Sequence, residues 1–387
     1  MDARGPAPPR QPLVAVALGL TIAGQALIQV SGWLLPASVR FPGPWAPTRA
    51  PDSSVLLSVA AGLPDLKPEH VTKLVYALIL RMDIAAGFAG WGAIAVQLMA
   101  LGAAAAATAV YVANRWGSRA GVLSAAALAL NPQIAQWTKT LLTDSLFISL
   151  MVLLVLALAR ALDREGSAGL VVVLALTAVF LRPNGLGAAA GALFVLILAM
   201  RRHRVVAASL SVVGLVAVVL FSPVFITPGG EENSLAARTY DGLVVWANPH
   251  DVNITMPVPR DPEDLSNTGL ARYAVTNPLP VTSLGLQRVA WELIQVRGHY
   301  PWSANLVTAL IVAAVFAFSL LGARATRGAS INRAIVGLSS GLALVIAATW
   351  AIAEGRFGWA LMATWSPLVG IGLDRLLTML TRRRRVR

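Results

Sequence analysis

Long apolar runs alternate with short polar connections along most of the chain. Ten of these runs predict helices that cross a membrane: residues 13–35, 86–112, 120–131, 145–160, 168–181, 186–200, 205–222, 303–322, 332–352 and 358–377. An α-helix rises about 1.5 Å per residue, so roughly 20 apolar residues cross a hydrocarbon layer of about 30 Å. Helices satisfy their own backbone hydrogen bonds in lipid. The pattern therefore predicts an all-α polytopic membrane protein with about ten transmembrane helices.

Two long segments outside the predicted spans interrupt this alternation, at residues 36–85 and 223–302. They divide the chain into three parts. An N-terminal membrane module covers 1–222 and includes 36–85 as a first outer loop with short surface helices. A long extracytoplasmic segment covers 223–302, and C-terminal transmembrane helices with a basic tail cover 303–387.

The composition agrees with a membrane location. The chain has 387 residues, of which 57% are hydrophobic and 13% charged, whereas a typical soluble domain has about 25% charged residues. The chain has no cysteine, which excludes disulfides, thiolate metal sites and a cysteine nucleophile. The first apolar run is longer than the core of about 7–15 residues found in secretory signals, so it predicts an uncleaved anchor.

The arginines indicate how the chain is oriented. The formal net charge is +13, and most arginines lie in short loops at one set of span ends or in the tail Arg382–Arg385. Short basic loops are typical of the cytoplasmic face. We therefore expect a plasma-membrane protein with both termini in the cytoplasm, and no nucleic-acid partner.

A small set of ionisable residues is left on the opposite, outer face. Asp52 precedes an apolar run, where an acid either caps a helix or, partly desolvated, acts as a general base. Asp144 enters the fourth span, where it or Thr143 would cap the helix, and Lys139 is close enough in sequence to pair with it. Arg182 and Arg356 occupy short turns between spans. Each is either a snorkelling side chain, with a Glu354–Arg356 pair as a further alternative, or part of a phosphate clamp.

Four motifs around these residues resemble the GT-C superfamily of glycosyltransferases that use polyprenyl-phosphate sugars, of the protein mannosyltransferase and aminoarabinose transferase type. DSSVLLSVAAGL, which begins at Asp52, resembles the family's D-x-x-x-Y-x-x-x-A region, with Ser53 and Leu56 where the family often has a second acid and an aromatic residue. LNPQIAQWTKTLLTDSLF resembles its entry to the fourth span, FLRPNGL its Arg-Pro-x-Gly turn, and EGRFGWALMATWSPLVGIGL its terminal segment.

The resemblance implies an inverting sugar transfer on the extracytoplasmic side. Asp52 would deprotonate an acceptor hydroxyl on a glycan, lipid or protein, with Asp65, Glu69 and Asp83 as reserve bases. Cations would take up charge on the departing lipid phosphate. The cofactor stays unknown, with a divalent cation as one candidate and no metal ligands assigned. The candidate substrate-binding residues are Asp144, Lys139, Arg182, Glu354, Arg356, Lys73 and His70.

Two other functions compete with transfer. A transporter or lipid-carrier flippase requires polar residues deep within spans, and the sequence has few, namely Gln25, Gln29 and Gln97. The other competing function is a scaffold for envelope assembly, in which the outer charges are only solvated surface.

Overall fold

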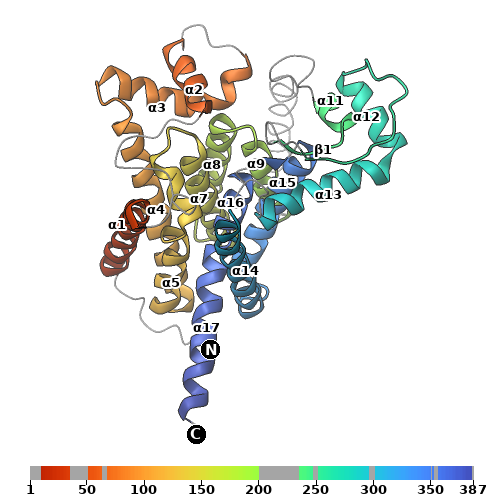
Figure 1. Ribbon diagram of the computed structural model, residues 1–387. Coiled ribbons are helices and arrows are strands. Elements are labelled where there is room, and N and C mark those ends of the chain that lie inside the picture. Colours follow the sequence, from red (N-terminus) through yellow and green to blue (C-terminus); the bar gives the residue numbers. More distant parts are fainter. Residues whose placement is uncertain are drawn as a thin grey trace.

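The protein is a bundle of helices with two smaller lobes at one end (Figure 1). The computed structural model describes residues 10–34, 51–62, 68–199, 235–246, 252–295, 301–349, 351–352 and 356–385. The predicted span 205–222 lies outside these residues. The bundle helices are α1 (Arg10–Leu34), α4 (Trp91–Trp116), α5 (Ser118–Ala129), α7 (Asp144–Leu162), α8 (Ala168–Leu181), α9 (Gly185–Ala199), α14 (Trp302–Ala325), α15 (Ser330–Ala348), α16 (Arg356–Ala363) and α17 (Ser366–Arg385).

Not every predicted span is confirmed. Within the described residues, five helices are long and apolar enough to cross a membrane, and they lie in α1, α4, α7, α14 and α15. Helices α5, α8 and α9 have 12, 14 and 15 residues. A 12-residue helix is only about 18 Å long, which is less than the hydrocarbon thickness. The molecule is an α-helical membrane protein, but the prediction of about ten spans is not confirmed.

The last predicted span, 358–377, is wrong as a single helix. The chain forms α16 and α17 with a turn at Thr364 and Trp365, whose N–H groups donate to Leu361 and Met362 at 3.2 and 3.0 Å. Pro367 causes the break, because it has no N–H to continue the helical ladder and is tolerated only near a helix start.

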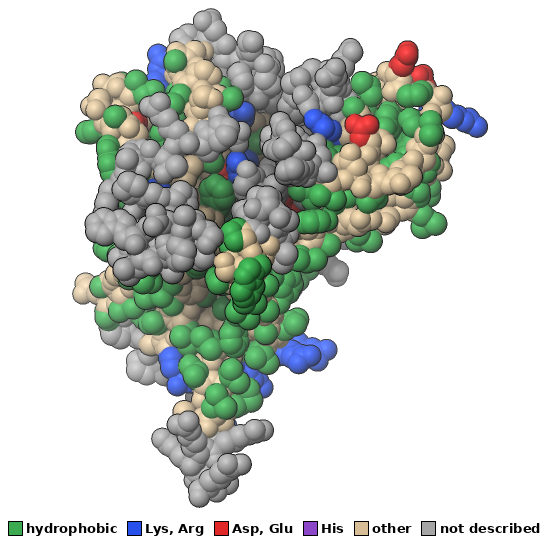
Figure 2. Space-filling view, viewed as in Figure 1, with side chains coloured by type: hydrophobic (Ala, Val, Ile, Leu, Met, Phe, Trp, Pro, Cys, Tyr) green, Lys and Arg blue, Asp and Glu red, His purple; other side chains and the backbone are tan. Residues whose placement is uncertain are grey.

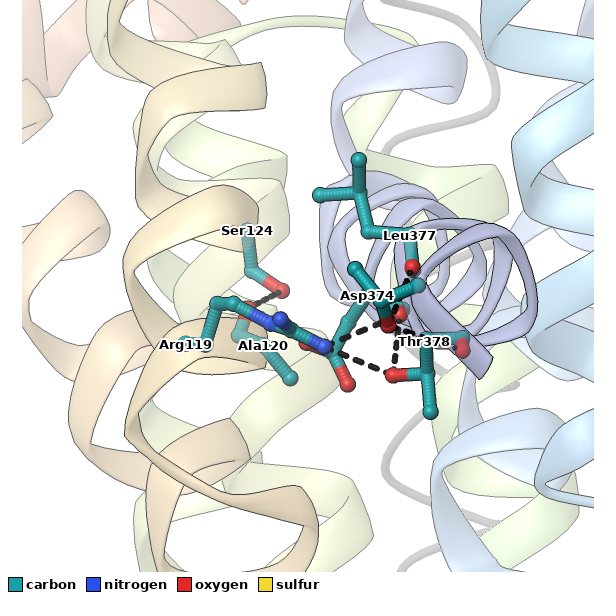
Figure 3. Close-up of polar contacts among 7 residues, drawn as sticks. Arg119, Ala120, Ser124, Asp374, Leu377 and Thr378 are labelled. Carbon is teal, nitrogen blue, oxygen red and sulfur yellow. Dashed lines mark hydrogen bonds and ion pairs between the residues drawn. The ribbon is translucent and has the colours of Figure 1, made fainter. Parts of the chain in front are cut away.

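The two ends of the bundle differ in charge. Helices α4, α5, α14 and α17 bring arginines to the end where the chain terminates, here called the basic end, and Figure 2 shows basic side chains gathered there. Arg119 of α5 forms an ion pair with Asp374 of α17 and donates to Thr378 Oγ1 at 2.6 Å (Figure 3). Ser124 Oγ contacts Ala120 O at 2.9 Å and Pro367 O at 3.1 Å. These contacts hold α5 against α17. The opposite end is called the site end below.

Helices α9 and α15 approach each other through glycines. A Cβ atom added to Gly341 would lie 1.9 Å from Gly187 O, and one added to Gly191 would lie 2.1 Å from Gly337 O. Small residues four positions apart on two helices allow such close backbone contact in membranes. This contact positions α15 next to α7, the most buried of the five candidate spans.

Two groups of elements lie outside the bundle at the site end (Figure 1). The first long loop contains α2 (Pro51–Ala61), the 3₁₀ helix η2 (Pro68–Lys73) and α3 (Leu74–Ala85), so helices are present where the sequence predicts short ones. The connection between α5 and α7 contains α6 (Pro132–Ala135) and η3 (Gln136–Lys139).

The second group comes from the long segment 223–302. It contains α11 (Leu235–Tyr240), α12 (Asn267–Thr276) and α13 (Pro278–Ile294), together with a small sheet that the all-α prediction omits. Strand β1 (Leu243–Trp246) pairs antiparallel with β2 (Val252–Asn253) and parallel with β3 (Ala351–Ile352). Because β3 comes just before α16 in the sequence, the sheet ties this segment to the part of the chain that contains Arg356.

Candidate functional site

The loop between α5 and α7 is fixed by side chains of neighbouring spans. Gln97 Nε2 of α4 donates to the carbonyl oxygens of Thr138 and Thr140, both at 3.0 Å. Gln25 Nε2 of α1 donates to Ala135 O at 3.1 Å. The two glutamines therefore satisfy loop carbonyls, which gives them a structural role. Nothing in these contacts indicates a transport pathway.

Asp144 and Arg182 form a buried ion pair at the site end. Asp144 begins α7, and Arg182 follows the last residue of α8. Arg182 Nη1 donates to Asp144 Oδ1, and the two side chains are 10% and 2% exposed. Arg182 is thus buried and paired, unlike a snorkelling arginine. Thr143 makes no capping hydrogen bond, and the Asp144 carboxylate faces Arg182.

The turn after Arg182 is shaped by a close backbone contact. A Cβ atom at Gly185 would lie 2.0 Å from Ala178 O, so only glycine fits there. The N–H of Gly185 donates to Arg182 O at 2.9 Å. The Arg-Pro-Asn-Gly sequence therefore holds Arg182 at the end of α8.

Aromatic rings connect this pair to Arg356. The Arg182 guanidinium carbon lies 4.8 Å from the ring centre of Phe357 and 5.9 Å from that of Phe147. Arg356 begins α16 and is buried, and its guanidinium carbon lies 5.4 Å from the ring centre of Trp137. Three predicted motifs, which are far apart in sequence, therefore meet at one place.

The first loop reaches the same place through Ser53. Ser53 is buried, and its Oγ donates to Leu141 O at 2.9 Å. Leu141 lies between Lys139 and Asp144, and Lys139 is also buried, which lowers its pKa. The start of α2 therefore adjoins the loop that contains both ionisable residues. Asp52 immediately precedes Ser53, but its side chain lies outside the described part.

Of the remaining candidate residues, the side chain of one is described by the structure and those of four are not. Lys73 ends η2 in a partly buried position. Four predicted residues lie outside the described side chains, namely Asp65, Glu69, His70 and Glu354.

The carboxylate of Asp83, one of the reserve bases, is bound to backbone N–H groups. This buried carboxylate accepts hydrogen bonds from the N–H groups of Gly90 and Gly92, both at 2.6 Å, and of Ala93 at 3.2 Å. The first N–H groups of a helix have no partner within the helix, so Asp83 caps α4. The three N–H groups occupy both carboxylate oxygens, so the Asp83 side chain is engaged in capping α4 rather than free to bind an acceptor hydroxyl.

Several buried donors near this cluster have no partner in the described structure. They are Tyr76 Oη, Trp137 Nε1, Ser145 Oγ and Asn184 Nδ2. Burial raises the pKa of Tyr76, and the nearby carboxylates of Asp144 and Asp83 raise it further, so the hydroxyl keeps its proton. Buried polar groups without partners are uncommon in proteins, and each calls for an explanation such as a ligand. Sequence reasoning missed Tyr76, because a tyrosine in an apolar helix usually packs in the core.

Two ionisable residues of α13 were also missed. Glu292 is fully buried, and its Oε2 accepts a hydrogen bond from Gly358 N at 2.8 Å, in the first turn of α16. Arg288 Nε and Nη1 donate to Leu243 O and Ala347 O at 2.8 and 3.0 Å, and burial lowers its pKa to about 10. Both are charged residues in a largely apolar helix, and this pattern in the sequence could have marked them as candidates.

No group of three or more His, Asp and Glu side chains that would suit a metal ion occurs among the residues the structure describes.

A comparison with known families agrees with the motifs. Residues 71–226 match a family model described as dolichyl-phosphate-mannose-protein mannosyltransferase. The matched range contains Lys139, Asp144 and Arg182, and excludes Asp52 and Arg356. Neither the curated proteins nor the solved structures gave a match. The family match confirms the resemblance for the two motifs that lie within it, at residues 130–147 and 180–186.

Proposed function

We propose that this chain, a membrane glycosyltransferase of the GT-C type, transfers a sugar from a polyprenyl-phosphate donor to an acceptor hydroxyl on the extracytoplasmic side, with inversion. The single observation that supports this most is the cluster of cations and hydrogen-bond donors at the site end. Arg182, Arg356 and Lys139 are all buried there, and Arg182 forms an ion pair with the Asp144 carboxylate.

The donor set suits a phosphate. Guanidinium groups present a planar fork that matches phosphate oxygens, and charge-assisted hydrogen bonds are about twice as strong as neutral ones. Trp137 and Asn184 add N–H donors, and Tyr76 and Ser145 add hydroxyls, all without partners in the described structure. A lipid phosphate with its tail in the bilayer supplies the acceptor oxygens that these groups lack.

In the proposed reaction, negative charge moves from the Asp52 carboxylate to the leaving phosphate. The Asp52 carboxylate takes the proton of the acceptor hydroxyl, and the hydroxyl oxygen attacks the anomeric carbon from the face opposite the phosphate. The bond between the anomeric carbon and the phosphate oxygen breaks, and polyprenyl phosphate leaves with an additional negative charge. Arg182 and Arg356 stabilise this charge, because donors that are already oriented need no rearrangement in the transition state. Asp144 holds Arg182 in place.

The proposed reaction is tested by following the donor in proteoliposomes. Transfer to any acceptor releases polyprenyl phosphate as the second product. This release is therefore measured across a panel of polyprenyl-phosphate hexoses and pentoses, with candidate acceptors added. We expect release with at least one donor. A donor that stays intact while its headgroup crosses the bilayer would instead identify a flippase.

Tyr76→Phe tests whether the unpaired hydroxyl serves the substrate. Because Tyr76 Oη has no partner in the described structure, its removal is expected to leave the thermal unfolding midpoint unchanged or slightly raised. Loss of one hydrogen bond to a charged phosphate is worth about 1.5–3 kcal/mol, which corresponds to roughly a 10- to 150-fold weaker interaction. Donor affinity and transfer rate are measured together.

Tyr111→Phe is the matched control, because Tyr111 lies near the basic end and contacts Asp163. If Tyr76→Phe and Tyr111→Phe have the same donor affinity, the hydroxyl of Tyr76 takes no part in binding.

A further inference from the structure

Helix α13 has an exposed face that is apolar. Leu279 and Leu286 are 80% and 67% exposed, and Ile294 is 55% exposed. At 100° per residue, these three and Ala290 fall within a narrow arc of the helix surface, which also contains one exposed polar residue, Ser283. The two charged residues of α13, Arg288 and Glu292, are both buried, so no charged side chain of the helix lies on this face.

The opposite face of α13 is already in use. Leu284 joins Val244 and Val245 in a small core, with Trp291 packed against it. The outer elements α11, α12 and β1 lie on that side of the helix in Figure 1. The apolar face therefore points away from the lobe to which α13 belongs. On the face drawn in Figure 2, the exposed charged side chains of this lobe lie on its side away from the spans.

The depth of α13 follows from two contacts with the spans. Gly285 and Arg288 lie against Ala347, in the last turn of α15 at the site end. Trp302, the first residue of α14, follows α13 by a short connection and is 76% exposed. Tryptophan at a span end is typical of the membrane–water interface. Helix α13 thus lies level with the site-end termini of α14 and α15.

We propose that α13 is an interfacial helix, which rests on the site-end leaflet through Leu279, Leu286, Ala290 and Ile294. An amphipathic helix of this kind buries its apolar face about 5–10 Å into the boundary between headgroups and acyl chains. Helix α14, a candidate span, also exposes apolar residues, among them Leu306 and Leu310. The inference does not depend on the proposed reaction.

The position of α13 on the leaflet affects the site, because α13 contacts α16. The inner face of α13 presents Glu292 to the N–H of Gly358, two residues after Arg356. Arg288 fixes the same helix to β1 and to α15. The bilayer surface therefore supports the helix against which α16 is held.

The test is a spin label at single cysteines, which needs no background substitutions because the chain has none. In lipid nanodiscs, Leu286→Cys is expected to give high accessibility to oxygen and several-fold lower accessibility to a water-soluble nickel chelate than Glu263→Cys. Glu263 is exposed elsewhere in the same lobe. Leu310→Cys, on the exposed side of α14, serves as the membrane reference.

Two results would overturn the proposal. Nickel accessibility at position 286 equal to that at position 263 would place the face in water. Strong spin–spin coupling between labels at position 286, in nanodiscs holding two copies, would identify the face as a contact between copies of the chain. Because Leu286 is exposed, the label does not disturb the core, and unfolding is checked by the same thermal midpoint in all three variants.

Discussion

Arg182→Lys is expected to lower the rate of sugar transfer by roughly 100- to 1,000-fold while the protein remains folded. Lysine keeps the positive charge that Asp144 requires, so the buried pair survives. It loses the planar fork that binds two phosphate oxygens at once, and removal of one well-placed donor to a developing negative charge typically costs this much in rate. Release of polyprenyl phosphate per folded molecule is the measurement.

Two further variants show whether the effect belongs to the site. Arg119→Lys makes the same change in an ion pair at the basic end and is expected to leave transfer unchanged. Arg182→Ala leaves the Asp144 carboxylate buried without its partner, which typically costs about 3–5 kcal/mol of stability, so a lower unfolding midpoint is expected. Full activity in Arg182→Lys would remove Arg182 from the phosphate site.

Asp52→Asn is expected to reduce transfer by roughly 100- to 10,000-fold, the range for loss of a general base. Asparagine has nearly the same shape but cannot accept the proton. Ser53 should still bond to Leu141 O, so folding and donor affinity are expected to stay the same. Transfer is measured at saturating donor, and donor affinity is measured separately by titration.

Asp83→Asn is the matched control for that experiment. It weakens the cap of α4, and loss of a helix cap costs about 0.5–2 kcal/mol, so the unfolding midpoint should fall while transfer per folded molecule is retained. The opposite result, with transfer lost in Asp83→Asn and kept in Asp52→Asn, would move the base to Asp83 and contradict the proposed mechanism.

The sequence was sufficient to bring three motifs to one end of the molecule. Residues in short turns between apolar spans cannot move far from the membrane boundary, so Asp144, Arg182 and Arg356 were limited to one face by the span pattern. Which of them touch was not predictable in this way. Asp144 and Arg182 are 38 positions apart, and their contact depends on how α7 packs against α8, whereas Lys139 was the nearer residue in sequence.

Three other features of the structure were not predicted from the sequence, each for a different physical reason. The break at Pro367 follows from a local rule, but the apolar run on both sides of it looked like one span. The role of Asp83 depends on how α3 and α4 meet, because its three donors belong to the next helix. In the sequence, the exposed face of α13 is as apolar as a face buried in the core would be. The contacts of Leu284, Arg288 and Glu292 in the structure show that the opposite face is the buried one.

The proposed function requires one lipid phosphate to bind where the four motifs meet. A density map of the protein in nanodiscs with added polyprenyl phosphate tests it most directly. We expect phosphate oxygens within about 3.2 Å of guanidinium nitrogens of Arg182 or Arg356, in a cavity that also contains the Asp52 side chain. A phosphate bound elsewhere, with Asp52 directed into bulk solvent away from both arginines, would contradict it.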